Sequence, residues 1–266
     1  MNTSPVSRNI KLVLAYNGAN YHGWQRQAEG FDTIQQRLEQ ALMMVVKHPL
    51  VVSGAGRTDS GVHALGQVAN FHTTNLSIPL LGLMQAVNSR LPADIVVRSA
   101  CQVDDSFHAS RSAIGKTYRY RICLSPTRQV DRTGLVYHYW RNLDVDRMRQ
   151  ASWRFIGRHD FRGLASSADK RENTVRTIFR CESAPVGDEI HITVQGDGFL
   201  HKMVRNLTGT LLEIGRGRWT IEQVDRLLAS RDRRDAGPTL PPDGLYMVCV
   251  HYQPGELSSW QAARSP

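Results

Sequence analysis

The sequence lacks the features that mark secreted, metal-binding or membrane proteins. Its four cysteines are scattered and form no C-x-x-C pair, so neither a zinc knuckle nor a disulfide framework is indicated, and we expect reduced, mostly buried thiols. No apolar run reaches the roughly 18 residues of a membrane span, and the N-terminus has no apolar core with a small-residue cleavage site. We therefore expect a cytoplasmic protein that makes no use of a membrane.

Two further absences bear on organisation and ligands. No low-complexity linker separates freely moving domains. The glycine-rich stretch SGAGRTDSGVHALGQVANF, residues 53–71, matches neither G-x-x-x-x-G-K-[ST] nor G-x-G-x-x-G. Binding of a nucleotide phosphate at a helix N-terminus is therefore poorly supported.

An excess of positive charge is the clearest compositional feature. The 266 residues include 33 lysines and arginines against 24 aspartates and glutamates, which gives a net charge of +9. This excess favours a polyanionic partner such as a nucleic acid, although a basic composition alone is weak support. The length fits one large domain or two intimate smaller ones.

Strand and helix patterns alternate along the chain and suggest two comparable α+β halves. Residues 32–46 carry apolar side chains at helical spacing after a capping box of Thr33 with Gln36. Residues 116–124 alternate strictly, with one aromatic and apolar face and one basic face. Further strands are expected at 10–16, 67–72, 94–103, 174–184, 189–199 and 245–252, and further helices at 78–91, 144–156, 201–215 and after Thr220.

The stretch 53–71 has an ordinary interpretation and a functional one. Glycine-rich segments are usually turns, in which Asp59 would only accept hydrogen bonds from backbone amides. However, its central R-T-D-S-G-V-H-A resembles the signature of the TruA-type tRNA pseudouridine synthases. The resemblance continues in that family's order through most of the chain, in YNGANYHGWQRQ, TIQQRLEQAL, SFHASRSAIGKTYRYRI, GRHDFRGLA, VRTI, GDGFLHKMVRNLTGTLLEIGRG and PPDGLYMVCVHY.

The resemblance implies an enzyme that converts uridines 38, 39 and 40 of the tRNA anticodon arm to pseudouridine, without cofactor or metal. Asp59 occupies the position of the family's catalytic aspartate. The N1–C1′ bond of the nucleoside must break and a C5–C1′ bond must form. A carboxylate can attack C1′ or remove the C2′ proton, and the sequence does not choose between these routes.

Two more residues take catalytic roles from the resemblance. Arg205 matches the arginine that pairs with the catalytic aspartate and would oppose the cost of burying its charge, whereas a helix-surface arginine is the alternative. Tyr118 matches the tyrosine that stacks on the target base, although Tyr118 and Tyr120 on one strand face also fit two core aromatics. The target nucleotide must leave the RNA stack to reach Asp59.

Several basic residues are candidate RNA contacts. Arg57 lies two residues before Asp59 and, in this family's loop, is placed to contact the RNA backbone, unless it forms a surface salt bridge. Lys116 and Lys202 adjoin the proposed site. Arg111 is a further candidate, because Ser110 stands where the family usually has arginine and the arginine follows one position later. If this segment were a strand, a shift by one residue would place the side chain on the opposite face. His63 is either structural or RNA-contacting, and Leu164 stands where an aromatic residue is common.

The resemblance also implies an architecture. It predicts an α+β fold of two similar, ferredoxin- or RRM-like sub-domains joined in a continuous, mostly antiparallel sheet flanked by helices, with the active-site cleft between them. We expect a flexible tail at 1–9, sub-domains at 10–112 and 113–253, and a tail at 254–266. The family's members are homodimers that hold the tRNA arm across both subunits, so a homodimer is implied.

Two other functional classes fit the sequence less well. A non-catalytic RNA-binding module would keep the aromatic strand and the charge but would not need Asp59 with a matched arginine downstream. A metal-dependent nuclease would need clustered carboxylates and histidines, and those near Asp59 lack ligand spacing.

Overall fold

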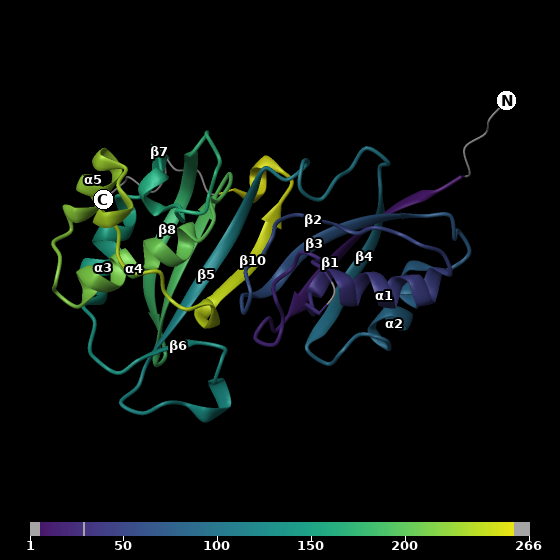
Figure 1. The fold of residues 1–266 in the computed structure, drawn as a ribbon, viewed down its shortest axis with the longest axis horizontal. Coiled ribbons are helices and arrows are strands. Elements are labelled where there is room, and N and C mark those ends of the chain that lie inside the picture. The colour runs from purple at the N-terminus through teal and green to yellow at the C-terminus, as the bar shows by residue number, and fades with distance from the viewer. Residues whose placement is uncertain (1–5, 29, 258–266) are drawn as a thin grey trace. The chain divides into compact units, whose positions relative to one another are not determined.

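The computed structural model describes residues 6–28 and 30–257, and the chain divides into two compact units (Figure 1). Met1–Ala113 and Met247–Val250 form the first unit, and Ile114–Tyr246 with His251–Pro266 form the second. Residues 1–5 and 258–266 of the predicted tails lie outside the described residues.

The predicted N-terminal tail extends two residues too far. Arg8 and Asn9 already belong to the first strand. The Asn9 side chain is fully buried and donates to the carbonyl oxygens of Asp104 and Phe107 at 3.0 and 2.8 Å. A buried amide with both donors satisfied fixes this end of the strand.

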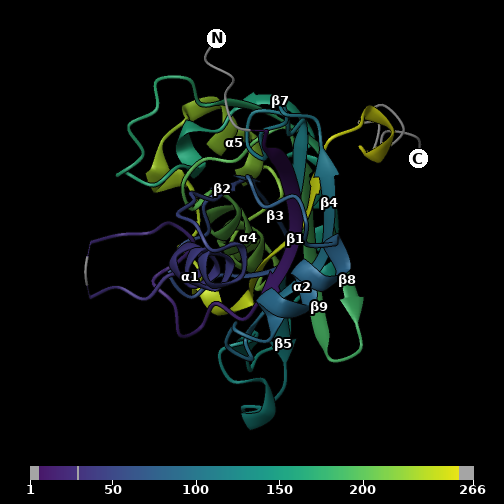
Figure 2. The same cartoon turned by 90° about the vertical axis from the view of Figure 1, so that its right-hand side faces the viewer.

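The first unit is an antiparallel sheet with two helices. Strand β1 pairs on one side with β3 and on the other with β4. Strands β2 and β10 also pair with β3, and residues Met247–Val250 of β10 belong to this unit. Helix α2 packs on β4 and on α1, which Figure 2 shows nearly end-on. The bounds are β1 (Arg8–Tyr16), α1 (Ile34–Val46), β2 (Ser53–Gly54), β3 (His63–Thr73), α2 (Leu80–Asn88), β4 (Ile95–Val103) and β10 (Leu245–His251).

Helix α1 forms as its sequence predicts. The Thr33 hydroxyl accepts a hydrogen bond from the Gln36 amide at 3.4 Å and caps the helix. The helix ends where Lys47 adopts a left-handed conformation with φ of 66°. Its apolar stripe is buried and comprises Ile34, Leu38, Ala41, Leu42 and Val45.

The second unit repeats this plan. Strand β5 is antiparallel to β9, which pairs with β8, and β8 pairs with β7; the short β6 runs parallel to β5. Helix α3 packs on β8 and α4, and α4 also contacts β5. The bounds are β5 (Gly115–Leu124), β6 (Tyr137–Tyr139), α3 (Val145–Trp153), β7 (Gly157–Asp160), β8 (Val175–Val186), β9 (Glu189–Gly196), α4 (Met203–Gly215) and α5 (Gln223–Ser230).

The two units share a pattern of strand pairing. In each unit, the first strand pairs with the strand that immediately precedes the second helix. Thus β1 pairs with β3 in the first unit, as β5 pairs with β9 in the second. The predicted α+β class, with mostly antiparallel strands flanked by helices, is confirmed. Three short strands, β2, β6 and β7, were not predicted.

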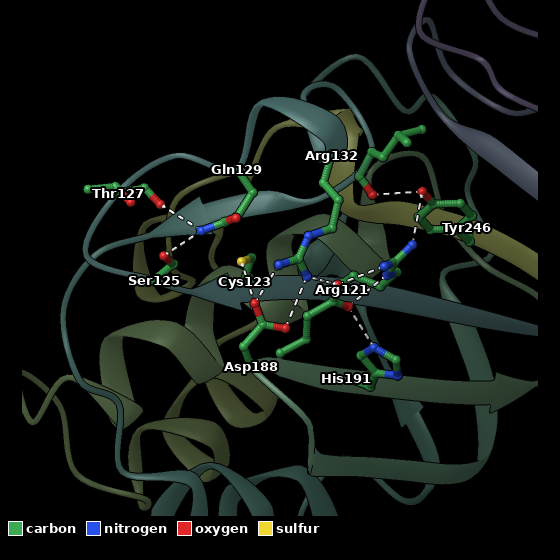
Figure 3. A network of polar contacts seen from close by, with 11 residues as sticks. Arg121, Cys123, Ser125, Thr127, Gln129, Arg132, Asp188, His191 and Tyr246 are labelled. Atoms are coloured by element: carbon green, nitrogen blue, oxygen red, sulfur yellow. Dashed lines mark hydrogen bonds and ion pairs between the residues drawn. The ribbon is translucent and has the colours of Figure 1, made fainter.

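A network of ion pairs holds the loop after β5 in the second unit. Figure 3 shows the Arg132 guanidinium directed at Asp188, and Arg132 also binds Glu189 at 2.9 Å. Glu189 accepts in addition from Arg121 at 2.7 Å and from His191 at 2.8 Å. Because Glu189 is buried and Arg132 comes from the loop, these contacts anchor the loop to the sheet.

Within the described residues, none of the four cysteines forms a disulfide; Cys123 and Cys181 are buried and the other two are partly exposed. Within residues 6–28 and 30–257, no helix combines the length and the apolar character that a membrane crossing requires.

Candidate active site

Asp59 begins a tight turn between β2 and β3. The Val62 amide donates to the Asp59 carbonyl oxygen at 3.1 Å, and Gly61 at the third position has φ of 79°. This left-handed conformation favours glycine, so the order D-S-G-V matches the turn's backbone requirements. Asp59 itself is partly exposed.

The motif at residues 16–27 holds this turn from both sides. The Trp24 amide donates to the Thr58 carbonyl oxygen at 3.0 Å. The Tyr21 carbonyl oxygen accepts from the Ser60 hydroxyl at 3.1 Å and from the Gly61 amide at 3.3 Å. The residues before and after Asp59 are thus fixed by the same neighbouring segment.

Two glycines of that motif allow the close approach. A Cβ on Gly18 would lie 2.0 Å from the Val62 carbonyl oxygen, and one on Gly23 would lie 2.6 Å from that of Thr58. Gly23 also has φ of 88°. Any larger residue would therefore push the two segments apart.

Two buried side chains complete the support of the turn. The Tyr16 hydroxyl bonds the Thr58 hydroxyl at 2.9 Å, and burial, partly offset by this bond, raises the pKa of Tyr16 to about 12. His63 is fully buried, and its Nδ1 accepts a hydrogen bond from the Gly18 amide at 3.0 Å. His63 therefore helps to hold Gly18 against the turn, which supports the structural interpretation of this residue.

Arg57 and Ser110 line one cavity in the first unit. Its volume is about 350 Å³, and Trp24 and His108 also contribute to its wall. Arg111 lies in a turn, where its amide approaches His108 Nδ1 at 3.4 Å. The shift of the arginine from position 110 to 111 therefore falls in a turn and does not reverse a strand face.

Tyr118 lies on β5 in the second unit with its ring against Phe199. The ring centroids are 4.9 Å apart at an interplanar angle of 77°, an edge-to-face contact. Tyr120 is completely buried, and its hydroxyl donates to the Pro241 carbonyl oxygen at 2.8 Å. Tyr120 therefore belongs to the core, whereas Tyr118 keeps 8% of its surface exposed.

Arg205 projects from the first turn of α4. Its Nε donates to the Leu240 carbonyl oxygen at 2.7 Å, which fixes the plane of the guanidinium. The loop of Leu240 packs closely on α4, since a Cβ on Gly209 would lie 1.9 Å from the Pro238 carbonyl oxygen. The apolar stripe that anchors α4 is buried as predicted and comprises Met203, Val204, Leu207, Leu211 and Ile214.

Lys202 immediately precedes α4 in a left-handed conformation with φ of 61°. Such a conformation is strained for a lysine and is often found next to functional sites. Lys116, near the start of β5, is partly buried. Burial and the nearby charges of Arg171 and Arg176 lower the pKa of Lys116.

The candidate residues are divided between the two units. Arg57, Asp59 and Arg111 lie in the first, and Lys116, Tyr118, Lys202 and Arg205 in the second. Their assembly into one site stays a prediction. Within the described residues, no three His, Cys, Asp or Glu side chains are grouped to hold a metal ion.

The sequence reasoning assigned no role to three supporting residues. Tyr16 and Trp24 hold the Asp59 turn, and Phe199 contacts the Tyr118 ring. All three lie within motifs that carry the family resemblance, YNGANYHGWQRQ and GDGFLHKMVRN. The resemblance of these motifs was the signal that could have pointed to them.

Comparisons with known proteins identify the family of this chain. A family model described as tRNA pseudouridine synthase matches residues 12–110 and 151–253. The chain is 42% identical to tRNA pseudouridine synthase A of Geobacter sp. (strain M21), over 92% of this chain and 99% of that protein. It is also 42% identical to tRNA pseudouridine synthase A 2 of Clostridium perfringens, over 92% of this chain and all of that protein. The chain therefore belongs to the tRNA pseudouridine synthase family, whose members are isomerases.

Proposed function

We propose that this protein isomerises uridine to pseudouridine at positions 38, 39 and 40 of the tRNA anticodon arm, with Asp59 as the catalytic carboxylate. The observation that carries the proposal is the rigid Asp59 turn, held by hydrogen bonds from Trp24 and to Tyr21. A preorganised carboxylate in a family of pseudouridine synthases is well suited to act on a ribose.

The reaction is an internal exchange of bonds. The N1–C1′ bond breaks and uracil leaves with the electron pair, the base turns, and C5 bonds to C1′. C5 loses its proton and N1 gains one, so that product and substrate are isomers. Asp59 either forms and releases an ester at C1′, or removes the C2′ proton and later returns it. Both routes begin with an ionised Asp59.

Two side chains of the second unit complete the proposed mechanism. Arg205 keeps Asp59 charged when bound RNA excludes water from the site, and its fixed guanidinium suits this role. Tyr118 stacks on the extruded base, and its edge contact with Phe199 holds the ring in place. The stacking offsets part of the unstacking cost of a few kcal/mol.

The proposal extends to RNA contacts and assembly. Arg57, Arg111, Lys116 and Lys202 contact the tRNA, in agreement with the net charge of +9. The protein acts in the cytoplasm as a homodimer that holds the tRNA arm across both subunits. Sedimentation at micromolar concentration tests the dimer, and a mass near 29.9 kDa would contradict it.

The proposal is tested with an unmodified tRNA transcript that carries uridine at positions 38 to 40. After incubation in EDTA, pseudouridine is mapped by carbodiimide labelling and primer extension. We expect stops at these positions and none in a transcript with cytidine there. Modification only elsewhere in the tRNA, or none without added metal, would overturn the proposal.

A further inference from the structure

Three basic side chains surround the turn after β9. Lys116 pairs in register with Gly196, the last residue of β9. The Arg176 side chain lies 3.2 Å from the point that a Cβ on Gly198 would occupy. Arg171 Nη1 donates to the Phe199 carbonyl oxygen at 3.1 Å. The three cations thus lie around Gly196–Phe199, although they come from different segments of the second unit.

The charges around this turn are incompletely balanced. Asp169 pairs with Arg171 at 2.5 Å, and Asp197 accepts from the Thr177 amide at 2.9 Å. Arg176 donates to the carbonyl oxygens of Asn173 and Val175, which carry no charge. Across the part of the chain that the structure describes, no ion pair joins Lys116 or Arg176 to a carboxylate. An excess of positive charge therefore stays beside the turn.

This arrangement is unfavourable for the protein alone. Burial and then the two arginines lower the pKa of Lys116, so its ammonium form is destabilised where it stands. Like charges that repel one another in the free protein are expected at sites that bind a ligand of opposite charge. A bound anion would relieve the repulsion.

The cluster adjoins the aromatic ring predicted to receive the base. Lys116 and Tyr118 are two residues apart on β5, so both side chains lie on the same face of the strand. The Tyr118 ring contacts Phe199, whose carbonyl oxygen binds Arg171. Within one nucleotide, base and phosphate are separated by only a ribose, so both fit neighbouring subsites.

We propose that Lys116, Arg171 and Arg176 bind a backbone phosphate of the RNA next to the nucleotide stacked on Tyr118. This inference rests on the proposed function and adds Arg171 and Arg176 to it. Lys116 and Arg176 bind the phosphate, while Arg171 also braces the turn through Phe199.

The salt dependence of RNA binding tests the subsite. An unmodified tRNA transcript is titrated at several salt concentrations with the Asp59→Asn protein, which leaves the RNA unconverted. Each lost phosphate contact lowers the slope of log affinity against log salt by about 1. We expect this decrease, with about tenfold weaker binding, for Lys116→Gln and for Arg176→Gln. Arg128→Gln, an exposed arginine of the same unit, is the control with an equal charge change.

Thermal stability separates a binding role from a structural one. Because repulsion is removed, Lys116→Met should melt at the same temperature as the parent or higher, while its RNA binding weakens. A lower melting temperature with unchanged salt slope would assign Lys116 to the fold and overturn the subsite. Slopes equal to that of Arg128→Gln would overturn it as well.

The two proposals fail separately. If the parent makes no pseudouridine but the slopes decrease as expected, the phosphate subsite stands and the proposed reaction is wrong. If the parent modifies tRNA and the slopes do not change, the reaction stands and the subsite is wrong.

Discussion

The carbonyl oxygen of Thr58 accepts a hydrogen bond from the Trp24 amide at 3.0 Å, one residue before Asp59. The same oxygen lies 2.6 Å from the point where a side chain on Gly23 would begin. The position of the proposed catalytic carboxylate therefore depends on a glycine 36 residues earlier in the chain.

Gly23→Ala should reduce turnover by tenfold or more, because the added methyl group displaces Thr58 and with it Asp59. The left-handed backbone, with φ of 88°, adds a cost of about 1–2 kcal/mol for alanine. Gly30→Ala is the matched control, since Gly30 has φ of 96° and, apart from its chain neighbours, no atom of the described residues lies within 4 Å of the point that a Cβ would occupy. Melting temperatures and initial rates of both variants check the prediction, which fails if the two variants lose equal activity.

Arg205→Lys should lower kcat by about 100-fold at nearly unchanged RNA affinity. Lysine keeps the charge but has no Nε–H to donate to Leu240, so its ammonium is not held in one place. Arg216→Lys at the other end of α4 is the control and should retain full activity. Single-turnover rates with saturating enzyme measure the effect, and a rate within twofold of the parent would remove Arg205 from the mechanism.

Tyr118→Phe should bind tRNA nearly normally and react at least about 100-fold more slowly, because stacking survives while the hydroxyl is lost. Tyr120→Phe removes the hydrogen bond to Pro241 and should cost about 1 kcal/mol of stability without such a rate loss. Rates and binding are compared at a temperature where both variants are folded. Equal rate losses in the two variants would contradict the different roles.

Acid should destabilise the second unit through Glu189 and Asp188. Burial opposes ionisation of Glu189, but hydrogen bonds from Arg121 and His191 outweigh it and lower its pKa from 4.5 to about 2. Hydrogen bonds from Arg132 lower the pKa of Asp188 from 3.8 to about 2. Carboxylates with lowered pKa stabilise the fold above their unfolded pKa values, and this stabilisation is lost as the pH falls from about 4.5 to about 2.

The melting temperature as a function of pH measures this loss. Glu189→Gln should melt lower than the parent at pH 6 and show a shallower decline below pH 4.5. Glu182→Gln removes an exposed carboxylate that pairs with Arg180 and should follow the parent. The same decline in all three proteins would show that the network does not carry the acid sensitivity.

The longer elements could be predicted because local signals were strong. The Thr33 cap and apolar stripe specified α1, and the strict alternation of residues 116–124 specified β5. The strands β2, β6 and β7 have two to four residues, too few to show a period, and they exist because longer neighbours pair with them.

The candidate site was only partly predictable, because the contacts that hold its side chains come from residues far away in the sequence. Motif resemblance suggested Asp59, Tyr118 and Arg205 as candidates, but the contacts that position these side chains depend on distant backbone atoms such as the Leu240 carbonyl oxygen. The pairing of β5, β9 and β8 brings Lys116 and Arg176 together, and Arg171 joins them from the loop before β8. In the sequence alone, the two arginines look like part of a solvated charged segment.

The most direct test of the account follows tritium release from C5 of labelled uridine in unmodified tRNA, without added metal. The parent should release tritium at the three anticodon-arm positions, and Asp59→Ala and Asp59→Asn should release none while binding the tRNA within a few-fold of the parent. Release by Asp59→Asn at the parent's rate would contradict the central claim that the Asp59 carboxylate carries the reaction.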